Sequence, residues 1–278
     1  MKIDRYNWEG PAEHLLALIE RANHEDDVAE KLHSRWNGLG CTGVVLLIGS
    51  VILAVNLGPV FFVLPVMMLG LTIFAFVRAR GHGQHDLDDR KLASARRAIS
   101  ILRADVPSTW PLGLEVDFRT YDQGGTVVEK TGGRTGPRAA KYAHDWLVLR
   151  ANLADGSSVV ATLTDKVSRK EKPKRKRTKV AETFVTRASV TLRLGKHRGS
   201  AEAVAAHLRG TSPPGGCTVL SLEGSARVLS AVVAAPIARR VVNRSTTESG
   251  MDRLASGDTL LQTLSWLYGG VAARVHAA

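Results

Sequence analysis

Residues 40–77 are the longest apolar stretch of the chain and contain no Asp, Glu, Lys, Arg or His. Asn56 to Pro59, which is typical of a tight turn, divides the stretch into two helical segments, 41–57 and 60–77. At about 1.5 Å per residue the first segment spans ~26 Å, close to the ~30 Å of a bilayer's hydrocarbon core. The pattern predicts a two-helix transmembrane hairpin. A re-entrant hairpin and a buried hairpin in a soluble core are the alternatives.

Charged and aromatic residues flank this stretch as expected at the edges of a membrane. Arg35 and Trp36 precede it, and a cation and an indole ring both suit the headgroup layer. Arg78 and Arg80 follow it, whereas the turn carries no charge, so the positive-inside rule places both ends of the hairpin in the cytoplasm. Pro65 lies one turn into the second segment and predicts a helix kink, because proline lacks an amide hydrogen.

Amphipathic patterns on both sides of the hairpin predict further helices. In residues 1–39, Leu15 and Ile19 fall on one face of an N-terminal helix or pair of helices. In residues 78–106, apolar residues from Leu92 onward recur every three or four positions, which predicts a juxtamembrane helix. Because both leave the membrane on the same side, we expect them to form a short cytoplasmic helical stalk.

Residues 107–195 change to a period of two, which predicts an antiparallel β domain. Leu114 and Val116 alternate with charged residues. Asp155-Gly156, a dipeptide suited to a tight turn, separates two further apolar runs. The predicted fold class is therefore an α+β membrane protein, in which the antiparallel β-rich cytoplasmic domain forms a small barrel or a sheet packed on helices.

Two other regions give weaker patterns. Residues 122–145 are rich in glycine and are predicted mostly as a loop, where Arg134 and Arg138 offer a cradle for a phosphate. The Lys-Ser/Thr ending of a P-loop is absent from that loop. Residues 196–278 are predicted as a mixed region that ends in a helix at about 259–275 and supplies no third membrane crossing.

The most basic segment of the chain lies between residues 168 and 179. Its close positive charges repel one another, so we expect an extended and exposed hairpin loop. Such a loop attracts anionic lipid headgroups or nucleic-acid phosphates, or serves only as a solvated cover for a sheet edge. Its candidate contact residues are Arg169, Lys170, Lys172, Lys174, Arg175, Lys176, Arg177 and Lys179.

Charge and composition narrow the class of protein. The chain carries a net charge of +12. The part after position 77 has 33 basic against 18 acidic residues, whereas residues 1–39 have 5 against 8. The two cysteines argue against a disulfide framework and fit a reduced compartment. The 26 Arg against 12 Lys favour a bacterial source with a GC-rich genome. No catalytic motif is present, and we expect no metal and no cofactor.

The sequence therefore favours a non-enzymatic integral protein of a bacterial cytoplasmic (inner) membrane, with both termini in the cytoplasm. Its expected partners are the lipid bilayer, anionic lipids of the inner leaflet, or another membrane or cytoplasmic protein. A subunit of a membrane homo-oligomer or pore is a second hypothesis, and a membrane-tethered enzyme or nucleic-acid binder is a third. Nucleic acid is the less favoured ligand, because no aromatic residue for base stacking lies between Lys166 and Thr183.

Overall fold

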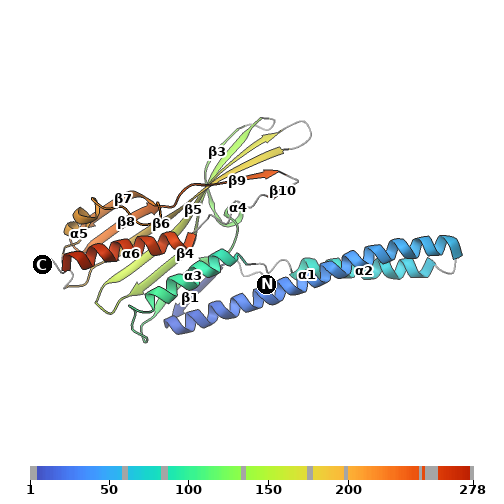
Figure 1. Ribbon diagram of the computed structural model, residues 1–278, viewed down its shortest axis with the longest axis horizontal. Helices are drawn as coiled ribbons and strands as arrows, with labels where there is room; N and C mark the ends of the chain where they lie inside the picture. Colours follow the sequence, from blue (N-terminus) through green and yellow to red (C-terminus); the bar gives the residue numbers. More distant parts are fainter. Residues whose placement is uncertain are drawn as a thin grey trace. The chain divides into compact units, whose positions relative to one another are not determined.

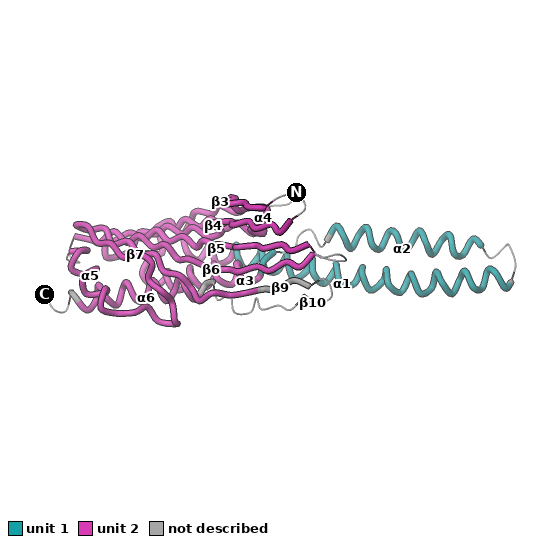
Figure 2. The backbone as a smooth tube through the Cα atoms, turned by 90° about the horizontal axis from the view of Figure 1, so that it is seen from above, with its two compact units in different colours: residues 1–2, 18–88 teal, residues 3–17, 89–278 magenta. Residues whose placement is uncertain are grey.

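A computed structural model describes residues 5–57, 62–82, 87–132, 136–173, 178–196, 200–243, 246–247 and 256–275. The chain forms two compact units (Figure 2). The helical unit comprises residues 18–88 with 1–2, and the sheet unit comprises residues 3–17 and 89–278. The fold is α+β: two long apolar helices packed as a hairpin, and an open antiparallel sheet.

The two helices of the hairpin are longer than the predicted membrane segments. Helix α1 (Ala12–Leu57) is continuous, so the predicted N-terminal helix and the first membrane segment are one element. Its glycines at 38 and 40 each cost about 1 kcal/mol in a helix, which is too little to break a pattern that is helical on both sides. Helix α2 (Val63–His82) places Pro65 in its first turn. Proline removes no helical hydrogen bond there, because the amides of the first turn have no partner within the helix. The kink stays a prediction, but a lost hydrogen bond no longer supports it.

Small and aromatic side chains hold α1 against α2. Gly43 faces Thr72 so closely that an added Cβ would lie 2.5 Å from the threonine Oγ1. Ala54 is fully buried. Trp36 meets Phe74 edge-on, with ring centroids 5.8 Å apart. Close approach of two helices through small residues is the packing mode common in membranes.

The outer surface of the hairpin is apolar. Only 17% of the most apolar window of α1 and 22% of that of α2 are buried, and both helices are long and apolar enough to cross a membrane. Val45, Val55 and Val66 are each more than two-thirds exposed. The core helix of a soluble protein would bury most of these side chains. Two exposed apolar helices of this kind are weak evidence for insertion into a membrane.

Three long strands form the spine of the ten-stranded sheet (Figure 1). At one end of the long strands, which we call the β2–β8 half, the strand order is β1-β2-β4-β5-β6-β8-β7. At their other end, which we call the β3–β9 half, β3 pairs with β4, β9 pairs with β6 and β10 pairs with β9. The strands are β1 (Arg5–Gly10), β2 (Leu112–Asp117), β3 (Thr126–Thr131), β4 (Arg138–Asn152), β5 (Ser158–Pro173), β6 (Thr178–Arg193), β7 (Thr218–Ser225), β8 (Val228–Ala234), β9 (Ala238–Asn243) and β10 (Thr246–Thr247).

Alternating side chains give the sheet two different faces. On the core face of the β2–β8 half, apolar residues such as Leu149, Leu163 and Val190 are fully buried. Helices α3 (Asp89–Leu102), α5 (Ala201–Leu208) and α6 (Ser256–Val275) pack against this face. The opposite, open face carries the intervening side chains, many of them Thr, Ser, Lys or Arg.

The structure settles the choice between barrel and packed sheet in favour of an open sheet packed on helices. The predicted loop at 122–145 instead contains the short helix α4 (Tyr121–Gly124), strand β3 and the start of β4. The 196–278 region contributes β7 to β10 to the same sheet and ends in α6, which begins three residues before the predicted 259. A further strand, β1, precedes α1 and pairs with β2.

Candidate anion-binding surface

The open face of the β3–β9 half gathers basic side chains from neighbouring strands. In β5 the even-numbered residues point to this face, and the register pairs Lys172 with Lys179 on β6. We call this group the basic patch. Its exposed members are Lys141, Lys166, Lys170, Lys172, Lys179 and Arg239.

Few acidic residues offset the basic patch. The described strands of this half place only Glu129 and Asp145 on the open face. Glu129 forms an ion pair with Lys141 at 2.6 Å, and Asp145 accepts a hydrogen bond from Thr164 at 2.5 Å. The remaining cations of the patch therefore give this face a positive potential.

Strand pairing divides the predicted basic segment between both faces of the sheet. Lys170 and Lys172 on β5 and Lys179 on β6 belong to the basic patch, whereas Arg169 points to the core face. These residues are strand rather than loop, because the β5–β6 hairpin extends to the pair Pro173 and Thr178. The other four predicted contact residues lie outside the described part of the chain: Lys174, Arg175, Lys176 and Arg177.

A polar pocket lies on the core side of the same strands. It has a volume of about 550 Å³ and is lined by residues of β3, β4 and β5, with Gly132 beside them. Within this lining, Arg169 donates to Glu171 of the same strand at 2.8 Å. Tyr142, Arg138 and Ala140 from β4 and Lys130 from β3 also line the pocket.

A hydrogen-bonded pair supports this pocket from the side of α4. The Tyr121 hydroxyl donates to the buried carboxylate of Glu182 at 2.5 Å. Burial and this bond to an anion raise the pKa of Tyr121, so the phenol stays protonated. The Tyr121 ring packs edge-on against Tyr142 and Phe184. The contacts fix the position of the pocket's aromatic wall.

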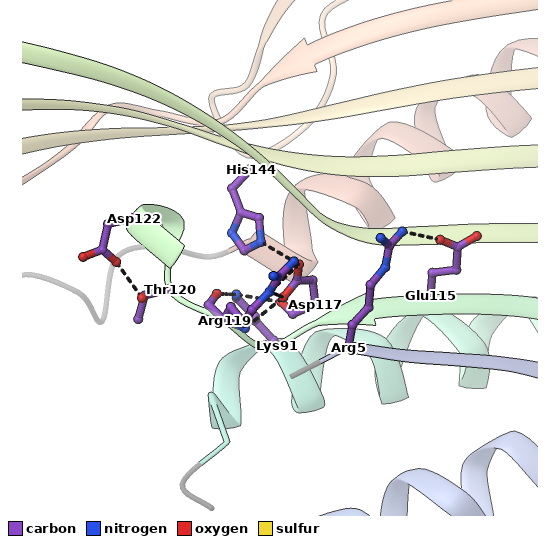
Figure 3. Close-up of polar contacts among 8 residues, drawn as sticks. All are labelled: Arg5, Lys91, Glu115, Asp117, Arg119, Thr120, Asp122 and His144. Carbon is purple, nitrogen blue, oxygen red and sulfur yellow. Dashed lines mark hydrogen bonds and ion pairs between the residues drawn. The ribbon is translucent and has the colours of Figure 1, made fainter. Parts of the chain in front are cut away.

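A second charged cluster lies buried where β2 ends (Figure 3). Arg119 donates to both carboxylate oxygens of Asp117, the closer at 2.6 Å. Lys91 of α3 donates to the backbone carbonyls of Asp117 and Arg119 at 2.9 and 2.8 Å. His144 lies with its Nε2 3.4 Å from the Asp117 carboxylate, at ion-pair distance but without hydrogen-bond geometry.

The surroundings of this cluster determine the charge of its members. Burial and the neighbouring Lys91 lower the pKa of His144 and outweigh the attraction of Asp117, so the imidazole is neutral at neutral pH. Burial alone would raise the pKa of Asp117, but hydrogen bonds from Arg119 hold it below its ordinary value. Gly124 covers the cluster: an added Cβ would lie 2.7 Å from His144 Nε2. These contacts join the end of β2 to α3 and β4.

The residues predicted for the membrane interface lie in the middle of α1 and near the C-terminal end of α2, where the two helices meet. Trp36 is half-buried against Phe74, and the Arg78 guanidinium lies 5.6 Å from the centre of the same ring. Arg35 and Arg80 are exposed. Trp36, Phe74 and Arg78 thus form one aromatic and cationic group on the hairpin.

The sequence interpretation did not include Lys141 and Arg239, because only strand register brings them beside the 168–179 segment. It also did not include Lys166, which lies on β5 itself. The signal for Lys166 was present: Lys166, Lys170 and Lys172 all occupy even positions of one strand. Among the described residues, no group of three His, Cys, Asp or Glu side chains could hold a metal ion. No protein-family model, curated protein or solved structure matches this chain.

Proposed function

We propose that this is a membrane-anchored, non-enzymatic protein whose sheet unit contacts anionic lipid headgroups of the inner leaflet through the basic patch. The observation that carries the proposal is the alignment of exposed cations from β4, β5, β6 and β9 on one face of a sheet. A planar array of lysines matches a planar array of phosphates better than it matches a single small ligand.

The apolar hairpin supplies the anchor for this contact. The exposed valines, leucines and phenylalanines of α1 and α2 require an apolar environment, and hydrocarbon provides it without a partner protein. The flanking Arg35, Arg78 and Arg80 favour the orientation with both helix ends in the cytoplasm. The sheet unit then faces the leaflet that carries anionic lipids.

The strength of the lipid contact depends on this anchor. Each basic residue near an anionic surface contributes about 1 kcal/mol, and the attraction fades beyond a Debye length of about 8 Å at physiological salt. Such a contact is marginal for a free protein but effective for one that is already held at the membrane. The anchor and the basic patch therefore act as two cooperating signals.

Lipid explains the patch better than nucleic acid does. The open-face positions of β4, β5 and β6 are Lys, Arg, Thr, Ser, Val, Ala, Asn and Asp, without an aromatic side chain. Single-stranded nucleic acid is held largely by stacking of bases on aromatic rings, which these strands do not offer.

A fluorescent label on the open face tests the proposal in the full-length protein. With Cys41 and Cys217 replaced, Thr183→Cys places an environment-sensitive dye in the row of Lys141 and Arg239. In nanodiscs, the dye should be quenched by headgroup-labelled lipids when the discs are anionic and much less when they are zwitterionic. Equal quenching in both discs would overturn the lipid contact.

Charge variants supply the matched control. Replacing Lys166, Lys170 and Lys172 with Gln should remove the difference between anionic and zwitterionic discs. The control replaces Arg150 and Arg193, which point to the open face in the β2–β8 half, and should leave the difference intact. High salt should weaken the quenching in anionic discs for the same electrostatic reason.

A further inference from the structure

The polar pocket is separate from the basic patch, because its cations point to the other face of the sheet. On β4 the residues Arg138, Ala140 and Tyr142 alternate onto the core face. Their neighbours on β5 are Glu171 opposite Arg138 and Arg169 opposite Ala140. The pocket is therefore built from positions that the basic patch does not use.

A small residue between two long cations creates the hollow. Ala140 pairs with Lys130 on β3 at one side and with Arg169 on β5 at the other. The alanine leaves the space between these two side chains unfilled, and the pocket of about 550 Å³ lies there. A concave, preformed site of this size is in the range that holds a small organic ligand.

The lining has an excess of positive charge. Lys130, Arg138 and Arg169 line the pocket, and Glu171 is the acidic residue among the lining side chains. Glu171 engages one terminal nitrogen of Arg169, while the Nε–H of Arg169 is buried without a hydrogen-bond partner among the described residues. A buried unpaired donor on a cation is costly, and an anionic oxygen in the pocket would satisfy it.

We propose that this pocket binds the phosphate group of a small organic ligand. Arg169 offers donors in a planar fork, which matches the oxygens of a phosphate, and Arg138 and Lys130 add positive charge. The ring of Tyr142 gives an apolar wall for the organic part. This chemistry is shared by a soluble phosphate monoester and by a phospholipid headgroup.

Titration calorimetry of the full-length protein in a phosphate-free maltoside detergent tests the proposal. The probes are glycerol 3-phosphate, inorganic phosphate and uncharged glycerol. We expect heat of binding with the two phosphates, the stronger with glycerol 3-phosphate, and none with glycerol. Absence of binding by both phosphates would overturn the proposal.

Two adjacent residues of β5 provide the matched variants. Arg169→Gln should weaken the binding of glycerol 3-phosphate roughly ten-fold or more, because it removes charged hydrogen bonds. Lys170→Gln removes the same charge from the other face and should leave the affinity unchanged. Equal weakening by both variants would show a diffuse electrostatic effect and would overturn the pocket.

A third variant guards against a folding defect in Arg169→Gln, since Arg169 also contacts Glu171 and Tyr121. Ala140→Leu keeps every charge and fills the hollow, so it should abolish binding while the thermal unfolding midpoint stays close to that of the parent. Full binding by Ala140→Leu would overturn the assignment.

The same titration in nanodiscs identifies the source of the phosphate. If the glycerol 3-phosphate signal seen in maltoside is lost in discs of either phospholipid, the pocket takes a lipid headgroup. If the signal persists in both discs, it takes a soluble phosphate. Either result supports a phosphate site. The outcome is independent of the dye measurement at Thr183, so failure of one proposal leaves the other testable.

Discussion

Gly156 occupies the loop between β4 and β5 with a φ of +77°, a conformation that side-chain-bearing residues rarely adopt. An added Cβ would meet nothing within 4 Å, so the cost of Gly156→Ala is purely conformational. We expect a loss of about 1 kcal/mol in the free energy of unfolding, measured by denaturant titration of the full-length protein. Gly136→Ala is the control, because that position is equally open and has no positive φ. A similar loss at both positions would contradict the explanation.

His144 couples stability to pH. Its pKa in the folded protein lies below the ordinary 6.5, so below about pH 6.5 the unfolded chain binds a proton that the folded chain does not. The free energy of unfolding should therefore fall as the pH drops through that value, since protonation would place a second cation beside Lys91.

Measurement of the unfolding midpoint between about pH 7.5 and pH 5 tests this coupling. His144→Gln keeps a polar side chain of similar size and should reduce the loss of stability over this range. An imidazole of His144 that titrates above 6.5 by nuclear magnetic resonance would show that the attraction of Asp117 outweighs burial.

At the scale of elements, two glycines of α1 distinguish the packed side of the hairpin from its outer side. Leucine at Gly43 would collide with Thr72, whereas Gly49 has nothing within 4 Å. Both replacements raise helix propensity by the same amount, so their difference isolates the packing of α1 against α2. Gly43→Leu should be less stable than Gly49→Leu by about 1–3 kcal/mol. Thermal unfolding in one detergent compares them, and equal midpoints would argue against the α1–α2 contact.

The elements with a strong period were predictable from the sequence. The uncharged run at 40–77 predicted the paired helices, and the alternation around Leu114 together with Asp155-Gly156 predicted β2, β4 and β5. The region from Val219 to Val242 was ambiguous, because Val, Ala and Leu occupy successive positions there and the sequence shows no clear period. The structure nevertheless buries alternate residues of β8. Strand β1 was missed because its partner β2 lies far away in sequence, and Tyr6 and Trp8 alone give too short an alternation to indicate a strand.

Part of the candidate site was also predictable from the sequence. The density of charge at 168–179 drew attention to Arg169, Lys170 and Lys172. Alternation then separates neighbours: Arg169 lines the pocket, and the two lysines join the basic patch. Lys141 and Arg239 lie far away in sequence, and only the pairing of β4 and β9 with their neighbours brings them to the same face. Register depends on long-range pairing, which local pattern does not encode.

At the scale of the whole molecule, the chain separates its apolar and basic surfaces by unit. The exposed apolar side chains belong mostly to α1 and α2, and the exposed lysines of the basic patch belong to the sheet unit. A protein that works at a bilayer needs both properties, one to enter hydrocarbon and one to meet headgroups. The proposed membrane topology must accommodate this division.

Cysteine labelling in intact bacterial cells tests that topology. In a background without Cys41 and Cys217, single cysteines replace Asn56, at the end of α1, and Ser100, on α3; both positions are exposed. If the hairpin crosses completely with both ends in the cytoplasm, a membrane-impermeant maleimide should label Asn56→Cys from outside and Ser100→Cys only after permeabilisation. Protection of both sites in intact cells would indicate a re-entrant hairpin. Labelling of Ser100→Cys from outside would reverse the orientation and remove the sheet unit from the inner leaflet.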